Sequence, residues 1–135
     1  MKQNALLTIA SLLSILFLTF HLADDIVRGF EKGGLPNLTA VPLFVIWLYG
    51  TLVLSGRRSG YIIMLLGSIL GVLVSLAHMR GAGLVGGRIA NSGGKLFWVW
   101  TILAVGVTSV LSLFLSARAL WRTRTSKPPS LQERI

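Results

Sequence analysis

Charged side chains are confined to short segments of this chain, and long apolar runs separate them. The four stretches without a charged residue are Asn4–Phe20, Leu38–Gly56, Ser59–Ala77 and Leu96–Ala117. Each is close to the roughly 20 apolar residues that a helix needs to cross the hydrocarbon core of a bilayer. We therefore predict four transmembrane helices, over about residues 4–22, 38–56, 59–78 and 96–120.

The composition agrees with a membrane protein and excludes a soluble domain. Of the 135 residues 53% are hydrophobic and 13% are charged, whereas soluble domains average about 25% charged residues. The chain has no cysteine, which excludes a disulfide-stapled secreted domain and thiol redox chemistry. We predict an all-α integral membrane four-helix bundle over residues 1–121 and a basic, disordered cytoplasmic tail over 122–135.

The distribution of basic residues predicts the orientation. Four spans place both termini on one side, and with the termini inside, eight of the 13 lysines and arginines are cytoplasmic and five are outside. The positive-inside rule favours this N-in, C-in arrangement. Trp98, Trp100 and Trp121 mark the two boundaries of the fourth span. The net charge of +9 follows from topology and lipid contact, so it does not argue for a nucleic-acid partner.

Small residues recur on one face of the third predicted span. Gly67, Gly71 and Ser75 fall within about 60° of one another on a helical wheel. Such a face allows helices to approach closely in lipid. Its partner is another span, a second copy of the chain, or a larger membrane complex.

The segment after the first span has its polar residues sorted onto one side. From His21 to Lys32 there is no strong helix breaker, because a single Gly29 is tolerated. The polar positions fall within an arc of about 120°. We predict that the first helix continues as an amphipathic extension on the outer side, with Asp24 paired to Arg28 one turn later.

Two histidines and two carboxylates reach the same outer boundary in this topology. His21 and Asp25 share a helix face, Asp24 is adjacent, and His78 continues the small-residue face that points between helices. Such a set suits a divalent metal ion, and two histidines from separate helices suit a haem. A His–Asp pair also suits a proton relay or a pH sensor. Imidazoles less than about 7 Å apart would permit a shared ion, since metal–ligand bonds are near 2 Å.

A purely structural interpretation of the same residues is also available. Asp24 and Asp25 would neutralise Arg80 and Arg88 in the outer loop, while the histidines cap hydrogen bonds. The two arginines also suit contact with a lipid phosphate or another anion. The loop segment Gly81–Gly86 matches GxGxxG, but a predicted membrane span precedes it in place of the strand that a dinucleotide site requires, so we do not predict nucleotide binding.

Two blocks carry a resemblance to known sequences. HLADDIVRGFEKGG at residues 21–34 and LAHMRGAGLVGGRIANSGG at residues 76–94 resemble small four-span bacterial membrane proteins of unassigned function. The resemblance covers the first span through Trp121 and leaves out the basic tail. It implies a location in the bacterial inner membrane and supplies no activity, substrate or cofactor.

The sequence carries no catalytic signature, and no predicted span has an acid or base at mid-membrane depth. We therefore expect a non-catalytic structural or accessory subunit that packs through its Gly/Ser helix faces, against itself or a larger complex. One alternative is an outer-face metal or haem site formed by His21, Asp25 and His78. A second is a lipid- or quinone-binding accessory protein that uses the outer loop.

Overall fold

Every regular element that the structure describes is helical. The computed structural model describes residues 2–80 and 87–125. Its elements are α1 (Lys2–Val27), the short 3-10 helix η1 (Leu35–Thr39), α2 (Ala40–Leu52), α3 (Arg58–His78), α4 (Gly87–Ala90) and α5 (Lys95–Thr125). Four segments are long and apolar enough to cross a membrane: Asn4–Val27, Leu35–Leu52, Arg58–His78 and Lys95–Thr125. The all-α class and the four long apolar helices are confirmed.

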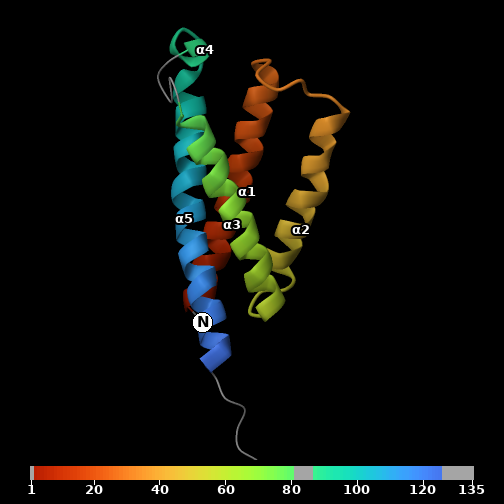
Figure 1. Cartoon of the computed structure of the whole chain (residues 1–135), viewed down its shortest axis with the longest axis vertical. Helices are drawn as coiled ribbons and strands as arrows, with labels where there is room; N and C mark the ends of the chain where they lie inside the picture. Colours follow the sequence, from red (N-terminus) through yellow and green to blue (C-terminus); the bar gives the residue numbers. More distant parts are fainter. Residues whose placement is uncertain (1, 81–86, 126–135) are drawn as a thin grey trace, which may run out of the picture.

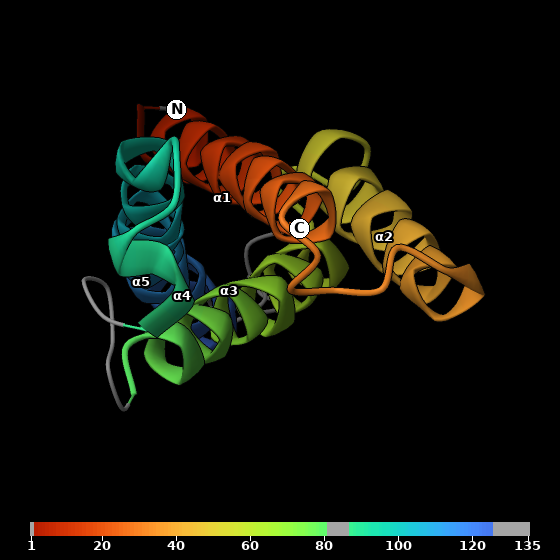
Figure 2. The ribbon, with the colours of Figure 1, turned by 90° about the horizontal axis from the view of Figure 1, so that it is seen from above.

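The helices form a bundle with α2 at its edge. α5 packs along both α1 and α3, whereas α2 lies against α1 and α3 on the side away from α5 (Figure 2). The beginning of α1 and the end of α5 lie at one end of the bundle (Figure 1). The end of α1, the end of α3 and α4 lie at the other, which we call the histidine end because it carries His21 and His78.

Many hydroxyl groups lie in the interior beside apolar side chains, and large apolar side chains also cover the outside. The buried serines are Ser11, Ser14, Ser68, Ser75, Ser109, Ser112 and Ser116. Leu66, Val107 and Phe114 are 60%, 70% and 63% exposed. In lipid, helices gain little from burying apolar surface against one another, so close packing and interhelical hydrogen bonds hold them together. This distribution is typical of a bundle with apolar surroundings.

The small-residue face of α3 is filled by helices of the same chain. A Cβ atom at Gly67 would overlap the indole ring of Trp47 on α2. One at Gly71 would overlap the hydroxyl of Ser109 on α5, and the buried Ser75 also hydrogen-bonds to α5. The glycines therefore let α3 approach two neighbours at once. Association with a second copy or a larger complex stays a prediction that these contacts do not test.

A closed ring of hydrogen bonds joins α1 to α2. The indole N–H of Trp47 donates to Ser11 Oγ at 2.9 Å. The Thr51 hydroxyl donates to the carbonyl oxygen of Trp47 at 2.8 Å, so the Ser11 hydroxyl is the donor in its 2.8 Å contact with Thr51. Each donor in this ring has an acceptor, as buried polar groups require. We call Ser11, Trp47 and Thr51 the hydroxyl ring.

The first helix continues beyond residue 22, as predicted, but it does not reach Lys32. α1 ends at Val27, and Gly29 lies beyond it with φ +71°, in the left-handed region that favours glycine. The Phe30 N–H donates to the Asp25 carbonyl oxygen at 2.9 Å, and the Gly29 N–H donates to that of Ile26 at 3.0 Å. This pair of bonds is a Schellman motif, which terminates the helix and satisfies its last carbonyls.

Part of the polar side of α1 is buried. His21 and Asp25 are only 1% and 5% exposed. These two residues of the polar strip therefore point into the bundle and must find partners on neighbouring helices, whereas Glu31 and Lys32 are exposed.

Three other predicted boundaries differ from the structure. α2 is shorter than the predicted second span, because η1 precedes it and the chain turns after Leu52. α5 continues to Thr125, so the first four residues of the predicted tail are helical. The rest of that tail, 126–135, and the GxGxxG segment, 81–86, lie outside the described residues.

Candidate metal centre

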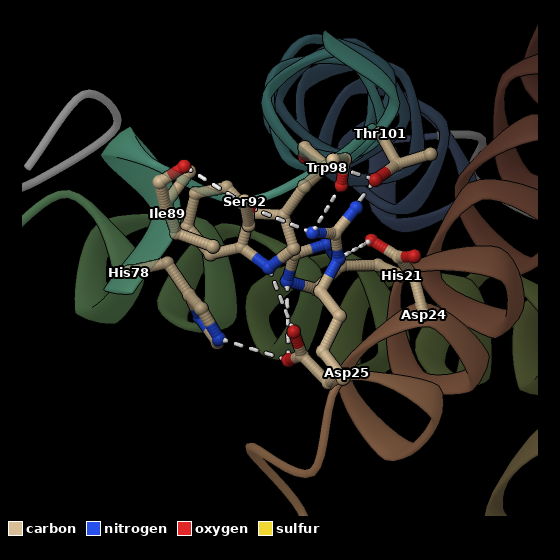
Figure 3. A network of polar contacts seen from close by, with 10 residues as sticks. His21, Asp24, Asp25, His78, Ile89, Ser92, Trp98 and Thr101 are labelled. Carbon is tan, nitrogen blue, oxygen red and sulfur yellow. Dashed lines mark hydrogen bonds and ion pairs between the residues drawn. The ribbon is translucent and has the colours of Figure 1, made fainter. Parts of the chain in front are cut away.

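Three side chains from two helices converge at the histidine end. Nε2 of His21 lies 3.5 Å, and Nε2 of His78 lies 3.4 Å, from Oδ2 of Asp25. The two imidazole centroids are 4.8 Å apart, and the rings meet edge to face. One ligand atom from each residue lies within 4.8 Å of the other two. Figure 3 shows the three side chains turned toward one another.

Local structure explains why these groups meet. His21 and Asp25 are one turn apart on α1, so both project from the same side of the helix. His78 is the last residue of α3 and continues the face of Gly71 and Ser75, which packs closely on α5. Close packing along that face brings the end of α3 beside α1.

A tryptophan of α5 orients the carboxylate. The indole N–H of Trp98 donates to Asp25 Oδ1 at 2.7 Å, and both residues are buried. Its ring also lies beside the imidazoles, with centroids 5.2 Å from that of His21 and 5.8 Å from that of His78. Oδ1 is therefore already bonded, and Oδ2 is the oxygen that faces the histidines.

Both imidazoles are oriented through their other nitrogen. His78 Nδ1 lies 2.8 Å from the carbonyl oxygen of Val74, which only accepts, so Nδ1 carries a proton. His21 Nδ1 lies 3.1 Å from the Thr101 hydroxyl oxygen, whose own proton goes to a backbone carbonyl of α5. That nitrogen is therefore a donor as well. In the neutral rings, both Nε2 lone pairs then face the carboxylate.

Three electron-rich atoms facing one another require a positive charge between them. His21 Nε2 is buried and has no hydrogen-bond partner. A buried polar atom without a partner costs about 1–3 kcal/mol. A bound cation, either a proton or a metal ion, removes this cost. Tetrahedral ligands with bonds of about 2.0–2.1 Å lie about 3.3 Å apart, which is close to the separations of both histidines from Asp25.

The same geometry does not suit a haem. A haem held by two histidines places its macrocycle between them, with one imidazole on each face. Here the imidazole centroids are 4.8 Å apart and both Nε2 atoms point to one carboxylate oxygen. No room for a macrocycle is left between His21 and His78.

Asp24 does not join the cluster. Its Oδ2 lies 2.7 Å from Nε of Arg28, which is the helical pair expected from the sequence. Nη1 of Arg28 also donates to the Ser92 hydroxyl and to the Gly93 carbonyl oxygen, both at 2.8 Å. Asp24 and Arg28 thus tie the end of α1 to the segment before α5.

Among the described residues neither Asp24 nor Asp25 pairs with Arg80, and nothing tests the predicted pairing with Arg88. Asp25 contacts the two histidines and Trp98, and Asp24 pairs with a residue of its own segment. Arg80 is exposed, and the side chain of Arg88 lies outside the described part of the chain. Anion or lipid contact by Arg80 and Arg88 stays a prediction.

A cavity of about 250 Å³ adjoins the cluster between α1, α2 and α3. His21, Asp25, His78 and Glu31 supply its polar lining. The rest is mainly apolar: Leu18, Leu22, Leu43, Phe44, Leu70 and Val74. A cation held by the cluster would therefore have one side turned toward an apolar space.

Comparisons with known proteins identify no relative: no family model, curated protein or solved structure matches the chain. The resemblance to small bacterial four-span proteins stays an expectation.

Sequence reasoning missed the role of Trp98. It grouped Trp98 with Trp100 as a boundary marker, but Trp98 is 4% exposed and Trp100 is 59% exposed. The available signal was the helix face. Counting back in steps of three or four from the buried Ser109 leads through Thr101 to Trp98, so these residues line the inward side of α5.

Proposed function

We propose that this chain is a small multi-pass membrane protein that binds one divalent transition-metal ion through His21, Asp25 and His78. The observation that supports it is the convergence of two Nε2 atoms and one carboxylate oxygen. Two imidazoles and one carboxylate form the donor set of many zinc enzymes and of non-haem iron(II) sites.

The hydrogen bonds around the three residues favour a metal ion. Metal-binding histidines typically donate their second N–H to a carbonyl, hydroxyl or carboxylate group, which fixes the ring. Here His78 has the Val74 carbonyl and His21 has the Thr101 hydroxyl in that role. The second nitrogen of each ring is thus bonded before an ion arrives, and the ligand atoms, which lie within 4.8 Å of one another, would draw together around it.

The location and orientation belong to the same proposal. We place the chain in the bacterial inner membrane, with the N- and C-termini inside and the histidine end on the outer face. Arg57 and Arg58 lie at the start of α3, at the end opposite the histidines, and Arg118 and Arg122 lie toward that end of α5. Basic residues favour the cytoplasmic side. The His78 side chain, 30% exposed, then offers a route for an ion from outside.

A proton-linked role is the second candidate. The titratable groups run from the partly exposed His78 through Asp25 to the buried His21. Such a row can pass or store a proton. A proton relay does not need a metal ion, so metal binding separates the two candidates.

The test is zinc binding to the full chain, purified in detergent and stripped with a chelator. Isothermal titration should show one Zn²⁺ per chain. Loss of an outer-shell partner lowers metal affinity about 10–100-fold, so Asp25→Asn and His78→Gln, which remove a ligand, should lower it more than about 100-fold. Asp24→Asn is the matched control: it removes the same charge from the adjacent residue, which is paired with Arg28, and should leave the affinity unchanged.

Two outcomes would contradict the proposal. One is the absence of saturable zinc binding to the unaltered chain. The other is an equal loss of affinity in Asp24→Asn and Asp25→Asn, which would mean that negative charge near the surface attracts the ion without a defined site. Circular dichroism of each variant shows whether its helices are folded. If Asp25→Asn is unfolded, the zinc affinity of His78→Gln still tests the site, because His78 lies at a partly exposed helix end.

A further inference from the structure

Glu31 is a fourth ionisable residue at the polar end of the cavity beside the candidate metal centre. It lies in the segment between α1 and η1 and lines the same cavity as His21, Asp25 and His78. It is exposed, and among residues 2–80 and 87–125 its carboxylate forms no ion pair. An acidic side chain without a cationic partner in this part of the chain therefore lies beside the three proposed ligands.

The turn after α1 fixes the backbone of Glu31 beside the site. The Asp25 carbonyl oxygen accepts the Phe30 N–H at 2.9 Å and the Glu31 N–H at 3.2 Å, so Glu31 is bonded to the backbone of a proposed ligand. Phe30 packs against the buried cluster that contains Ile89 and Trp98. The Glu31 side chain, by contrast, is outside any helix and exposed, which leaves it free to turn.

The charge of the proposed site favours a second carboxylate. A divalent ion bound to two neutral imidazoles and to Asp25 keeps one net positive charge. The side chains of His21 and Asp25 are only 2% and 8% exposed, and an uncompensated charge in such surroundings is costly. Asp24 is already paired with Arg28, so Glu31 is the nearby carboxylate that remains to neutralise the ion.

The coordination of the ion also favours a fourth ligand from the cavity. Three protein ligands leave one position of a tetrahedral ion open. The unpartnered Nε2 of His21 shows that the other positions lie inside the bundle. Of the described residues that line the cavity, Glu31 is the only one besides the three proposed ligands with a carboxylate or an imidazole.

We propose that Glu31 is the fourth ligand of the metal ion and closes the site by turning its carboxylate toward the ion on binding. The inference rests on the proposed function. Glu31 is not among the three residues whose ligand atoms lie within 4.8 Å of one another, so the side chain must move to reach the ion. Four protein ligands leave no position for water. The chain would therefore hold or carry the ion, and would not use it to activate water for hydrolysis.

The first experiment measures the zinc affinity of the full chain in detergent by isothermal titration. Glu31→Gln should lower the affinity about 10–100-fold, which is less than the loss in Asp25→Asn, because water can take the fourth position. Asp24→Asn is the control, since it removes the same charge from a residue that is paired with Arg28 and does not line the cavity. Its zinc affinity should be that of the unaltered chain. Glu31 is exposed, so we expect Glu31→Gln to fold normally.

The second experiment distinguishes a ligand from a nearby charge. Co²⁺ replaces zinc, because its visible absorption reports its ligands, and free imidazole is the probe. At about pH 8 most of the imidazole is neutral, so the carboxylates do not repel it. Glu31→Gln, with an exchangeable water on the ion, should bind imidazole at a concentration more than about tenfold lower than the unaltered chain requires. Asp24→Asn should respond as the unaltered chain does.

The outcomes separate this inference from the proposed function. An unchanged zinc affinity in Glu31→Gln, or equal imidazole binding by Glu31→Gln and the unaltered chain, would overturn the fourth ligand and leave the site of three ligands intact. Equal losses of zinc affinity in Glu31→Gln and Asp24→Asn would overturn it too, because the effect would be one of charge alone. The absence of metal binding to the unaltered chain would contradict the proposed function and this inference together.

Discussion

Two buried tryptophans donate their indole N–H groups to two different kinds of polar cluster. Trp47 donates to Ser11 in the hydroxyl ring, where each hydrogen bond leads to the next and returns to the Trp47 backbone. Trp98 donates to Asp25, where the chain of hydrogen bonds stops at a carboxylate oxygen facing two imidazole nitrogens. One cluster is satisfied within the protein, and the other leaves acceptor atoms that a cation would satisfy.

The difference distinguishes buried polar groups that join helices from buried polar groups that are left to bind a ligand. In the hydroxyl ring every donor has an acceptor, so the network joins α1 to α2 and needs nothing further. In the candidate metal centre, hydrogen bonds fix the orientation of all three side chains but leave His21 Nε2 without a hydrogen-bond partner. Unsatisfied, pre-oriented acceptors at one point are what a ligand site requires.

We expect the largest effect on stability from Gly67→Leu, because it disrupts the packing on which the hydroxyl ring depends. The new side chain would overlap the indole ring of Trp47 and force α2 away from α3. We expect the free energy of unfolding to fall by about 3 kcal/mol, measured by chemical denaturation in detergent. Gly93→Leu is the control, because a Cβ atom at Gly93 meets nothing within 4 Å.

This variant also tests the expectation that the small-residue face associates with other chains. Crosslinking in membranes would report association of the unaltered chain and of Gly67→Leu. A variant that keeps the stability of the unaltered chain but loses crosslinking would contradict our account, since the face would then be filled by a second copy and not by Trp47.

A smaller and more selective effect is expected from replacing each tryptophan by phenylalanine. Trp98→Phe removes the donor that orients Asp25, and outer-shell changes of this kind lower metal affinity about 10–100-fold. Trp47→Phe removes the donor of the hydroxyl ring, which should cost about 1–3 kcal/mol of stability and leave zinc affinity unchanged. Calorimetric zinc titration and chemical denaturation give the zinc affinity and the stability of each variant. An equal loss of zinc affinity in the two variants would contradict the comparison.

The long apolar helices could be predicted from the sequence because hydrocarbon thickness sets their length. The end of α1 could not. Gly29 is tolerated within a helix and is equally suited to end one, and the choice was decided by the Schellman motif that caps the Asp25 carbonyl. The inward direction of the polar strip depended on α3 and α5 supplying partners, which periodicity within α1 does not reveal.

The candidate metal centre could be predicted in part from the sequence. The turn-spaced pair His21 and Asp25, and the position of His78 on the small-residue face, follow from helix geometry within single segments. That all three meet depends on how closely α3 packs against α5 and α1. Trp98 was missed because tryptophans near a span boundary ordinarily mark the interface, and only its helix face distinguishes it from Trp100.

The most direct measurement of the central claim is X-ray absorption at the zinc edge of the zinc-loaded chain. We predict two imidazole nitrogens at about 2.0–2.1 Å and a carboxylate oxygen at about 2.0–2.2 Å, with one imidazole fewer in His21→Gln. A zinc environment without imidazole, or one that is identical in the unaltered chain and in His21→Gln, would contradict the account.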